Sequence, residues 1–148
     1  MPKSKSRRRL LWLLPVALVA IAGVGVGAMM MPPPADLDLA LSKPTDKGLY
    51  VATAEPGPEP IVVGQIHSWT IAVMAPDGTP IEHATISIDG GMPQHGHGLP
   101  TVPQVTGEAA SGRYTVEGMK FNMPGWWVIK LGVDGPQGPD TATFNLIL

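Results

Sequence analysis

The sequence contains no cysteine, so disulfide bonds, thiolate metal sites and cysteine nucleophiles are all excluded. Aromatic residues make up only 5% of the 148 residues, and charged residues only 15%. Glycine (18 residues) and proline (17 residues) are abundant instead, and at this density they interrupt long helices. Because 44% of the residues are hydrophobic, which is normal for a folded protein, the composition leaves two classes open. These are a small β domain and a disordered stalk.

Charge is distributed very unevenly along the chain. Five of the ten basic residues lie within the first nine positions, where there is no acidic residue. From residue 32 onward there are five basic and twelve acidic residues, which gives a formal charge of −7. Nucleic-acid binding depends on basic patches that meet phosphate groups, so the sequence predicts no nucleic-acid partner.

A long uncharged segment separates these two regions, since no charged side chain lies between Arg9 and Asp36. Residues 10–31 form an apolar run of 22 residues, and a helix of that length spans about 33 Å, enough for the hydrocarbon core of a bilayer. The preceding basic residues, 1–9, are expected to stay in the cytoplasm. We therefore predict a single-pass protein of the inner (cytoplasmic) membrane, anchored in lipid through residues 10–31, with a periplasmic or extracytoplasmic C-terminal domain.

A cleaved signal peptide is the main alternative for the same segment. Residues 10–19 would be its apolar region, and Ala20-Ile21-Ala22 has the small-x-small form of a cleavage site. The apolar run continues for nine residues beyond Ala22, which favours an uncleaved anchor.

The exported part divides into a proline-rich tether, residues 32–47, and a domain, residues 48–148. In the domain, short segments with alternating apolar and polar residues are separated by glycine and proline, which is typical of strands. The segments that we expect to form strands are 49–54, 66–74, 81–88, 112–118, 127–133 and 142–148.

Two turn signals support this division of the domain. Asp77-Gly78 provides the backbone conformations that a hairpin requires, and residues 134–139 form the next turn. Six or seven short strands in about a hundred residues indicate an all-β fold, a β-sandwich. Without disulfides, its core must be held by packing alone.

One segment carries unusual chemistry, Met92-Pro93-Gln94-His95-Gly96-His97-Gly98. Two histidines two positions apart project to the same side of an extended backbone, and their glycine neighbours allow a ligand or another backbone to approach closely. Further along the chain, Met119 and Met123 lie just before a pair of tryptophans. Imidazole and thioether ligands together suit copper, above all Cu(I).

A structural role for the same residues remains open at this point. His95 and His97 could form a tight corner that hydrogen-bonds the backbone, and the methionines could fill the core beside tryptophan. The other histidines are less informative. His67 shares a face with Trp69 and is expected to be partly buried, whereas His83 is expected to be solvated on the polar side of its strand.

Catalysis finds little support in the sequence. No serine lies in a Gly-x-Ser-x-Gly motif, and no glycine-rich phosphate loop is followed by lysine. The acidic residues are scattered, without a close pair that could act as general acid and base. We therefore expect that the protein is not an enzyme.

The chain from about Tyr50 to Leu148 resembles the YtkA-like / FixH-like family of small membrane-anchored or secreted proteins. The resemblance implies an immunoglobulin-like β-sandwich on the outer side of the membrane. FixH-like members are associated with assembly of haem–copper oxidases or their cation-pump partners, and related domains accompany heavy-metal efflux components. The motifs that carry the resemblance are Met92-Pro93-x-His95-Gly96-His97-Gly98, Gly112-x-Tyr114 and Phe121-x-Met123-x-Gly125-x-Trp127.

Transferred onto this chain, the family motif points to Met92, His95, His97 and Met123 as metal ligands, with Met119 a weaker candidate. The expected function is that of an accessory protein which binds copper for delivery, sequestration or assembly of a membrane oxidase or efflux complex. The alternative is an interaction module that docks onto such a complex without metal, through an apolar contact patch formed by Met92, Pro93 and exposed methionines. A small-molecule carrier that binds between the sheets is a third hypothesis, less favoured because large inward side chains are expected to fill the core.

Overall fold

The computed structural model describes residues 32–148, and its compact unit spans Pro33–Leu148. The predicted cytoplasmic segment, 1–9, and the predicted anchor, 10–31, lie outside the described residues. Within residues 32–148, no helix has the length and apolar character needed to cross a membrane.

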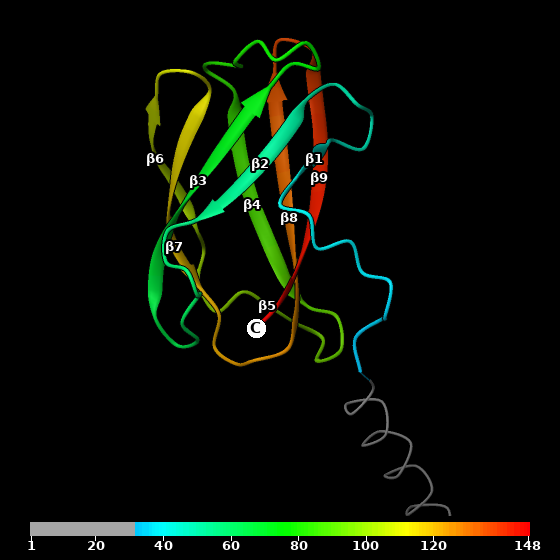
Figure 1. Ribbon diagram of the computed structural model, residues 1–148. Coiled ribbons are helices and arrows are strands. Elements are labelled where there is room, and N and C mark those ends of the chain that lie inside the picture. Colours follow the sequence, from blue (N-terminus) through cyan, green and yellow to red (C-terminus); the bar gives the residue numbers. More distant parts are fainter. Residues whose placement is uncertain (1–31) are drawn as a thin grey trace, which may run out of the picture. The chain divides into compact units, whose positions relative to one another are not determined.

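The described residues are organised entirely by β-strands (Figure 1). All pairings between neighbouring strands are antiparallel, and short turns or loops join them. The strands in this part of the chain are β1 (Ser42–Pro44), β2 (Val51–Pro56), β3 (Ile66–Met74), β4 (Thr85–Met92), β5 (His97–Gly98), β6 (Gln104–Ala109), β7 (Arg113–Lys120), β8 (Trp126–Gly135) and β9 (Gly138–Ile147).

Two sheets form the fold, one of five strands in the order β1-β2-β3-β7-β6 and one of four in the order β5-β4-β8-β9. Along β8 and β9 the inward residues are buried and alternate with more exposed ones, as expected for a sheet with one face in the core. Large rings fill the space between the sheets, and Trp69, Trp127, Phe121 and Phe144 are each at most 1% exposed. The predicted all-β class is therefore confirmed.

Strand positions agree with the sequence where the alternation is strongest. The predicted strand 66–74 has the same bounds as β3, but the segment predicted at 81–88 becomes a strand only at Thr85. The reason is local, because His83 has a positive φ of 58° that interrupts an extended backbone. Ile81 is buried all the same, so its apolar character reflects a loop that covers the core.

Three strands were not predicted from the sequence: β1, β5 and β6. β1 and β5 are only three and two residues long, too short to show an alternating pattern. β6 is exposed at every position, so it lacks the apolar face that alternation reveals. Edge strands of this kind are defined by their neighbour and not by their own sequence.

The two turn signals have different outcomes. Residues 134–139 contain a hairpin between β8 and β9, whose last pair is Gly135 with Gly138. The Asp77-Gly78 turn also exists, since Gly78 has a positive φ of 86° and its amide donates to the Ala75 carbonyl (2.9 Å). It joins β3 to β4, which lie in different sheets, so the predicted hairpin is wrong and the turn is a crossover.

The segment interpreted as a tether contributes to the sandwich at its C-terminal end. β1 pairs with β2, Leu41 packs against the core, and Thr45 is buried. The Asp38 carbonyl also accepts a hydrogen bond from the Asn145 side-chain amide (2.9 Å). β1 itself contains no apolar side chain except proline, but Leu37, Leu39 and Leu41 alternate just before it, so the sequence held a partial signal for this attachment.

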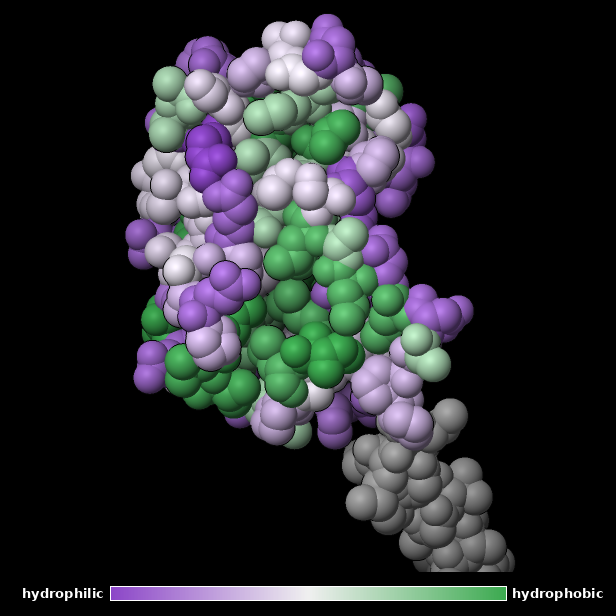
Figure 2. All heavy atoms as spheres, viewed as in Figure 1, coloured by the Kyte–Doolittle hydropathy of each residue, from purple (hydrophilic) through white to green (hydrophobic). Residues whose placement is uncertain are grey.

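Apolar side chains gather on the lower half of the face shown in Figure 2, where β3 begins and β9 ends. Ile66, the first residue of β3, is 65% exposed, and Val62 in the preceding loop is also exposed. Ile147, at the end of β9, is a third large apolar residue that reaches solvent.

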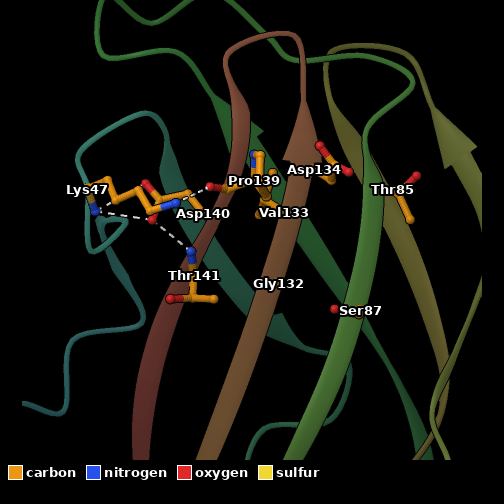
Figure 3. A pocket seen from close by; sticks show the side chains of 9 residues that line it. All are labelled: Lys47, Thr85, Ser87, Gly132, Val133, Asp134, Pro139, Asp140 and Thr141. Carbon is orange, nitrogen blue, oxygen red and sulfur yellow. Dashed lines mark hydrogen bonds between the residues drawn. The ribbon is translucent and has the colours of Figure 1, made fainter.

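A buried carboxylate fastens the N-terminal part of the domain to β9 (Figure 3). Asp140 accepts hydrogen bonds from the Thr45 hydroxyl (2.5 Å) and from the amides of Lys47 (3.1 Å), Leu49 (3.2 Å) and Thr141 (2.8 Å). Burial raises the pKa of Asp140, but these donors outweigh burial and lower it to about 2. A surface depression of about 290 Å3 lies beside the carboxylate. The oxygens of Asp140 already accept the hydrogen bonds described above. We assign this group a structural role.

Replacing this carboxylate should weaken the fold in a pH-dependent way. We expect Asp140→Asn to lower the free energy of unfolding by about 1–2 kcal/mol at pH 7, because an amide replaces a charged acceptor. The folded-state pKa is depressed from 3.8, so this stabilisation is present above about pH 4 and is lost as the pH falls towards 2. Denaturant unfolding between pH 7 and pH 2 measures it, with exposed Asp134→Asn as the control. Equal pH profiles for the two variants would contradict this role.

Candidate functional site

One end of the sandwich carries the residues that the sequence singled out. The turn between β4 and β5 and the loop between β7 and β8 both lie at the lower end in Figure 1, as does the C-terminus. Gly125 and Leu148 exchange backbone hydrogen bonds of 2.8 Å and 3.1 Å, which fixes this loop against the end of the chain.

The two histidines come together through a tight turn. His97 lies in β5, whereas His95 lies in the turn before it, so the extended backbone assumed from the sequence is not present. The amides of His95 and Gly96 both donate to the Met92 carbonyl, at 3.1 Å and 2.9 Å, and Gly96 has a positive φ of 67° that reverses the chain. The two imidazole rings nevertheless lie close together, with centroids 5.9 Å apart and planes at 29°.

The orientation of the His97 ring is set by two contacts. Its Nδ1 lies 3.2 Å from the Gly98 carbonyl oxygen, and a carbonyl can only accept, so Nδ1 carries the proton in this arrangement. The lone pair of the neutral ring is then on Nε2. The ring also rests edge-on against Trp127, with centroids 5.9 Å apart. His97 is exposed, so Nε2 belongs to a side chain that solvent and ligands can reach.

Met92 lies in the core beside these rings. It pairs directly with His97 across β4 and β5, so the two side chains leave the same face of the sheet. Met92 is only 1% exposed, and its terminal methyl lies 2.9 Å from the position that a Cβ at Gly125 would take. The sulfur is thus part of the apolar core and not of the open surface.

The other two methionines have different environments. Met123 is partly buried, and its carbonyl accepts a hydrogen bond from Trp127 Nε1 (3.1 Å), so it adjoins the ring that supports His97. Met119 is fully buried on β7 and pairs directly with His67 of β3. His97 is therefore paired with Met92 across the strands, and Trp127 contacts both the His97 ring and the Met123 carbonyl. Met119 pairs with a different histidine, His67.

Glycines allow the short strand β5 to approach β4. A Cβ at Gly91 would lie 2.5 Å from the His97 carbonyl oxygen, so any side chain there would displace the histidine strand. Gly90, Gly91 and Gly98 also line a depression of about 250 Å3 that includes Met92 and His97. The close backbone approach expected from these glycines is therefore present.

His67 has a feature that the sequence pattern did not indicate. It is partly buried, as expected, but both ring nitrogens are buried and have no hydrogen-bond partner among the described residues, and the same is true of Trp69 Nε1. Burial lowers the pKa of His67, so its ring is neutral at pH 7. The available signal was the shared face of His67 and Trp69, which correctly indicated burial. It could not reveal missing partners.

His83 is solvated as expected, with 88% of its side chain exposed. Its Nδ1 lies 3.2 Å from a carboxylate oxygen of Glu108. Across residues 32–148, no three histidine, cysteine, aspartate or glutamate side chains are placed to hold a metal ion together.

The position of Met92 can be tested through its neighbour Gly125, which has a positive φ of 126°. Gly125→Ala should lower the free energy of unfolding by about 1–3 kcal/mol, because a non-glycine residue is strained at this φ and its Cβ meets the Met92 methyl. Gly138→Ala is the matched control, with a φ of 99° and no atom within 4 Å of the added Cβ.

We expect Gly125→Ala to be the more destabilising of the two in denaturant unfolding. Met92→Leu removes the terminal methyl. In that background the difference between the two alanine variants in the free energy of unfolding should largely disappear. A difference that persisted unchanged in that background would show that Met92 does not pack where we place it.

Three comparisons with known proteins were informative to different degrees. No curated protein matches the chain. Among solved structures, the chain is similar to the crystal structure of a DUF4426 family protein from Pseudomonas aeruginosa PAO1. The two are 18% identical, the match covers 73% of this chain and 94% of that one, and the TM-score is 0.49. The YtkA-like family model matches residues 53–132, more than half of the sequence, including the histidine turn and Trp127. The chain therefore belongs to the YtkA-like family.

Proposed function

We propose that this protein is a membrane-anchored extracytoplasmic accessory protein that binds copper through the His95–His97 pair. The observation that carries the proposal is the close approach of the two rings at one end of the sandwich, with centroids 5.9 Å apart. His97 is oriented for this role, because the Gly98 carbonyl engages Nδ1 and leaves the Nε2 lone pair for a metal.

The spacing of the rings is compatible with one shared ion. A metal bound about 2.0 Å from a ring nitrogen lies about 3.1 Å from the ring centroid, so two rings that share it have centroids at most about 6.2 Å apart. The observed centroid separation is 5.9 Å. Two imidazoles suit Cu(II), whereas thioethers suit Cu(I). Met92 pairs with His97 but is buried, so its sulfur would join the ion only from the core side of the rings, and Met123 is the second thioether that we propose for the reduced ion.

The role of the site would be to hold copper or to transfer it, and not to transform a substrate. The exported region carries a formal charge of −7, which favours association with cations over nucleic acid. Candidate recipients are a membrane oxidase under assembly and a metal-efflux complex. Sequestration without a recipient is the third possibility within the same function.

Copper affinity provides the direct test. We expect the full chain in detergent to bind Cu(II), and His95→Ala/His97→Ala to weaken that binding at least tenfold, since even groups that only orient a ligand change metal affinity by about 10–100-fold. Competition with a chromophoric chelator measures the affinity.

His83→Ala is the matched control. It also removes an exposed histidine, but His83 contacts Glu108 and does not belong to the His95–His97 pair. It should leave the Cu(II) affinity unchanged. Equal affinities for the native chain and the double variant would exclude the proposed site.

The mass and the N-terminus of the mature protein show whether the anchor is retained. If residues 10–31 remain as a transmembrane anchor, protein purified from membranes should retain its N-terminal region, and external protease should digest the domain in intact spheroplasts. A mature N-terminus immediately after Ala22 would establish the cleaved signal peptide instead.

Docking onto a membrane complex without metal is the second candidate function. The version in which Met92 forms an exposed apolar patch is not supported, because Met92 is buried. Val62, Ile66 and Ile147 are exposed apolar residues at the same end of the sandwich, and they favour this candidate. A partner that co-purified equally with metal-depleted protein and with the His95→Ala/His97→Ala variant would support it.

A further inference from the structure

His67 poses a problem of hydrogen bonding inside the sandwich. Both of its ring nitrogens are buried without a partner in the described chain, and Trp69 Nε1 is buried and unpaired beside it. Nearly all buried polar groups in folded proteins have a partner, and exceptions commonly mark a bound water or ion. An occupant between the sheets would supply what the protein atoms do not.

The strand register places a methionine opposite this histidine. His67 in β3 pairs with Met119 in β7, and Cβ atoms of directly opposed residues lie about 4.5–5.5 Å apart. Met119 is fully buried, and the His67 ring contacts the inward rings of Phe121 (5.7 Å between centroids) and Trp69 (6.4 Å). The imidazole and the thioether therefore leave the same face of the sheet, side by side.

We infer that His67 and Met119 form a second metal site, internal to the sandwich, that is selective for Cu(I). Imidazole and thioether are soft ligands that suit this monovalent ion, whereas Ca2+, Mg2+ and other hard ions require oxygen ligands. The rings of Trp69 and Phe121 pack against the His67 ring, and aromatic rings can stabilise a desolvated cation beside them.

A series of ring contacts links the internal site to the His95–His97 pair. Phe121 contacts both His67 and Trp127, with 5.1 Å between the Phe121 and Trp127 centroids, and Trp127 contacts the ring of His97. The internal site uses none of the residues of the His95–His97 pair, so each can be tested in the absence of the other.

The test uses the full chain in detergent with His95→Ala/His97→Ala as the background, which removes the His95–His97 pair. Anaerobic titration with Cu(I), in competition with a chromophoric Cu(I) chelator, should show one remaining equivalent. Ag(I), a redox-inert substitute, should quench tryptophan fluorescence in the same protein because Trp69 adjoins the site. The background variant should show no comparable affinity for Cu(II).

Adding Met119→Leu to this background should weaken Cu(I) binding at least tenfold and abolish the Ag(I) quenching. The substitution conserves volume, so the thermal midpoint should change little, and this separates ligand loss from misfolding. Met74→Leu is the matched control on β3, because Met74 is a partly exposed methionine at the other end of the strand.

Two outcomes would overturn the internal site. In the first, the background variant binds no Cu(I), which is expected if a buried water alone bridges His67 and Trp69. In the second, Met119→Leu leaves the Cu(I) affinity unchanged. Neither outcome affects the proposed function, which depends on Cu(II) binding by the His95–His97 pair. Conversely, failure of Cu(II) binding there would leave the Cu(I) result intact.

Discussion

Close packing of the two apolar sheet faces is the constraint on which the structure depends, because no disulfide links the sheets. Large rings dominate that packing at the functional end. Phe121 contacts Trp69 and Trp127, with centroids 6.1 Å and 5.1 Å apart. Trp127 also supports the ring of His97. The same contacts that stabilise the sandwich therefore position the candidate ligand, so the site rests on the core and not on a loop alone.

The candidate copper site combines a rigid base with an adaptable edge. β5 is only two residues long and is held against β4 by glycines that permit close backbone approach. His95 lies in the turn and reaches His97 only because Gly96 reverses the chain. The separation of the two rings therefore depends on the geometry of a single turn.

The methionines illustrate how burial changes an interpretation. Met92 was considered both as a ligand and as part of an exposed docking patch, and its burial removes the patch. Met119 shared a sequence neighbourhood with Met123, yet the register pairs it with His67 on β3. Thioethers that look equivalent along the chain thus occupy distinct places. The His95–His97 pair carries the proposed function, and His67 with Met119 carries a separate inference.

The sequence by itself determined the all-β class, the bounds of β3, the inward row of β8 and the family, since these follow from local alternation and a contiguous motif. It also indicated that His95 and His97 form a pair, although for a different backbone geometry. Only the tertiary structure decided that the Asp77-Gly78 turn crosses between sheets, that β1 joins the sandwich and that His67 faces Met119. The physical reason is that alternation encodes which face of a strand is buried, whereas the partner of each strand is chosen by packing between residues far apart in the chain.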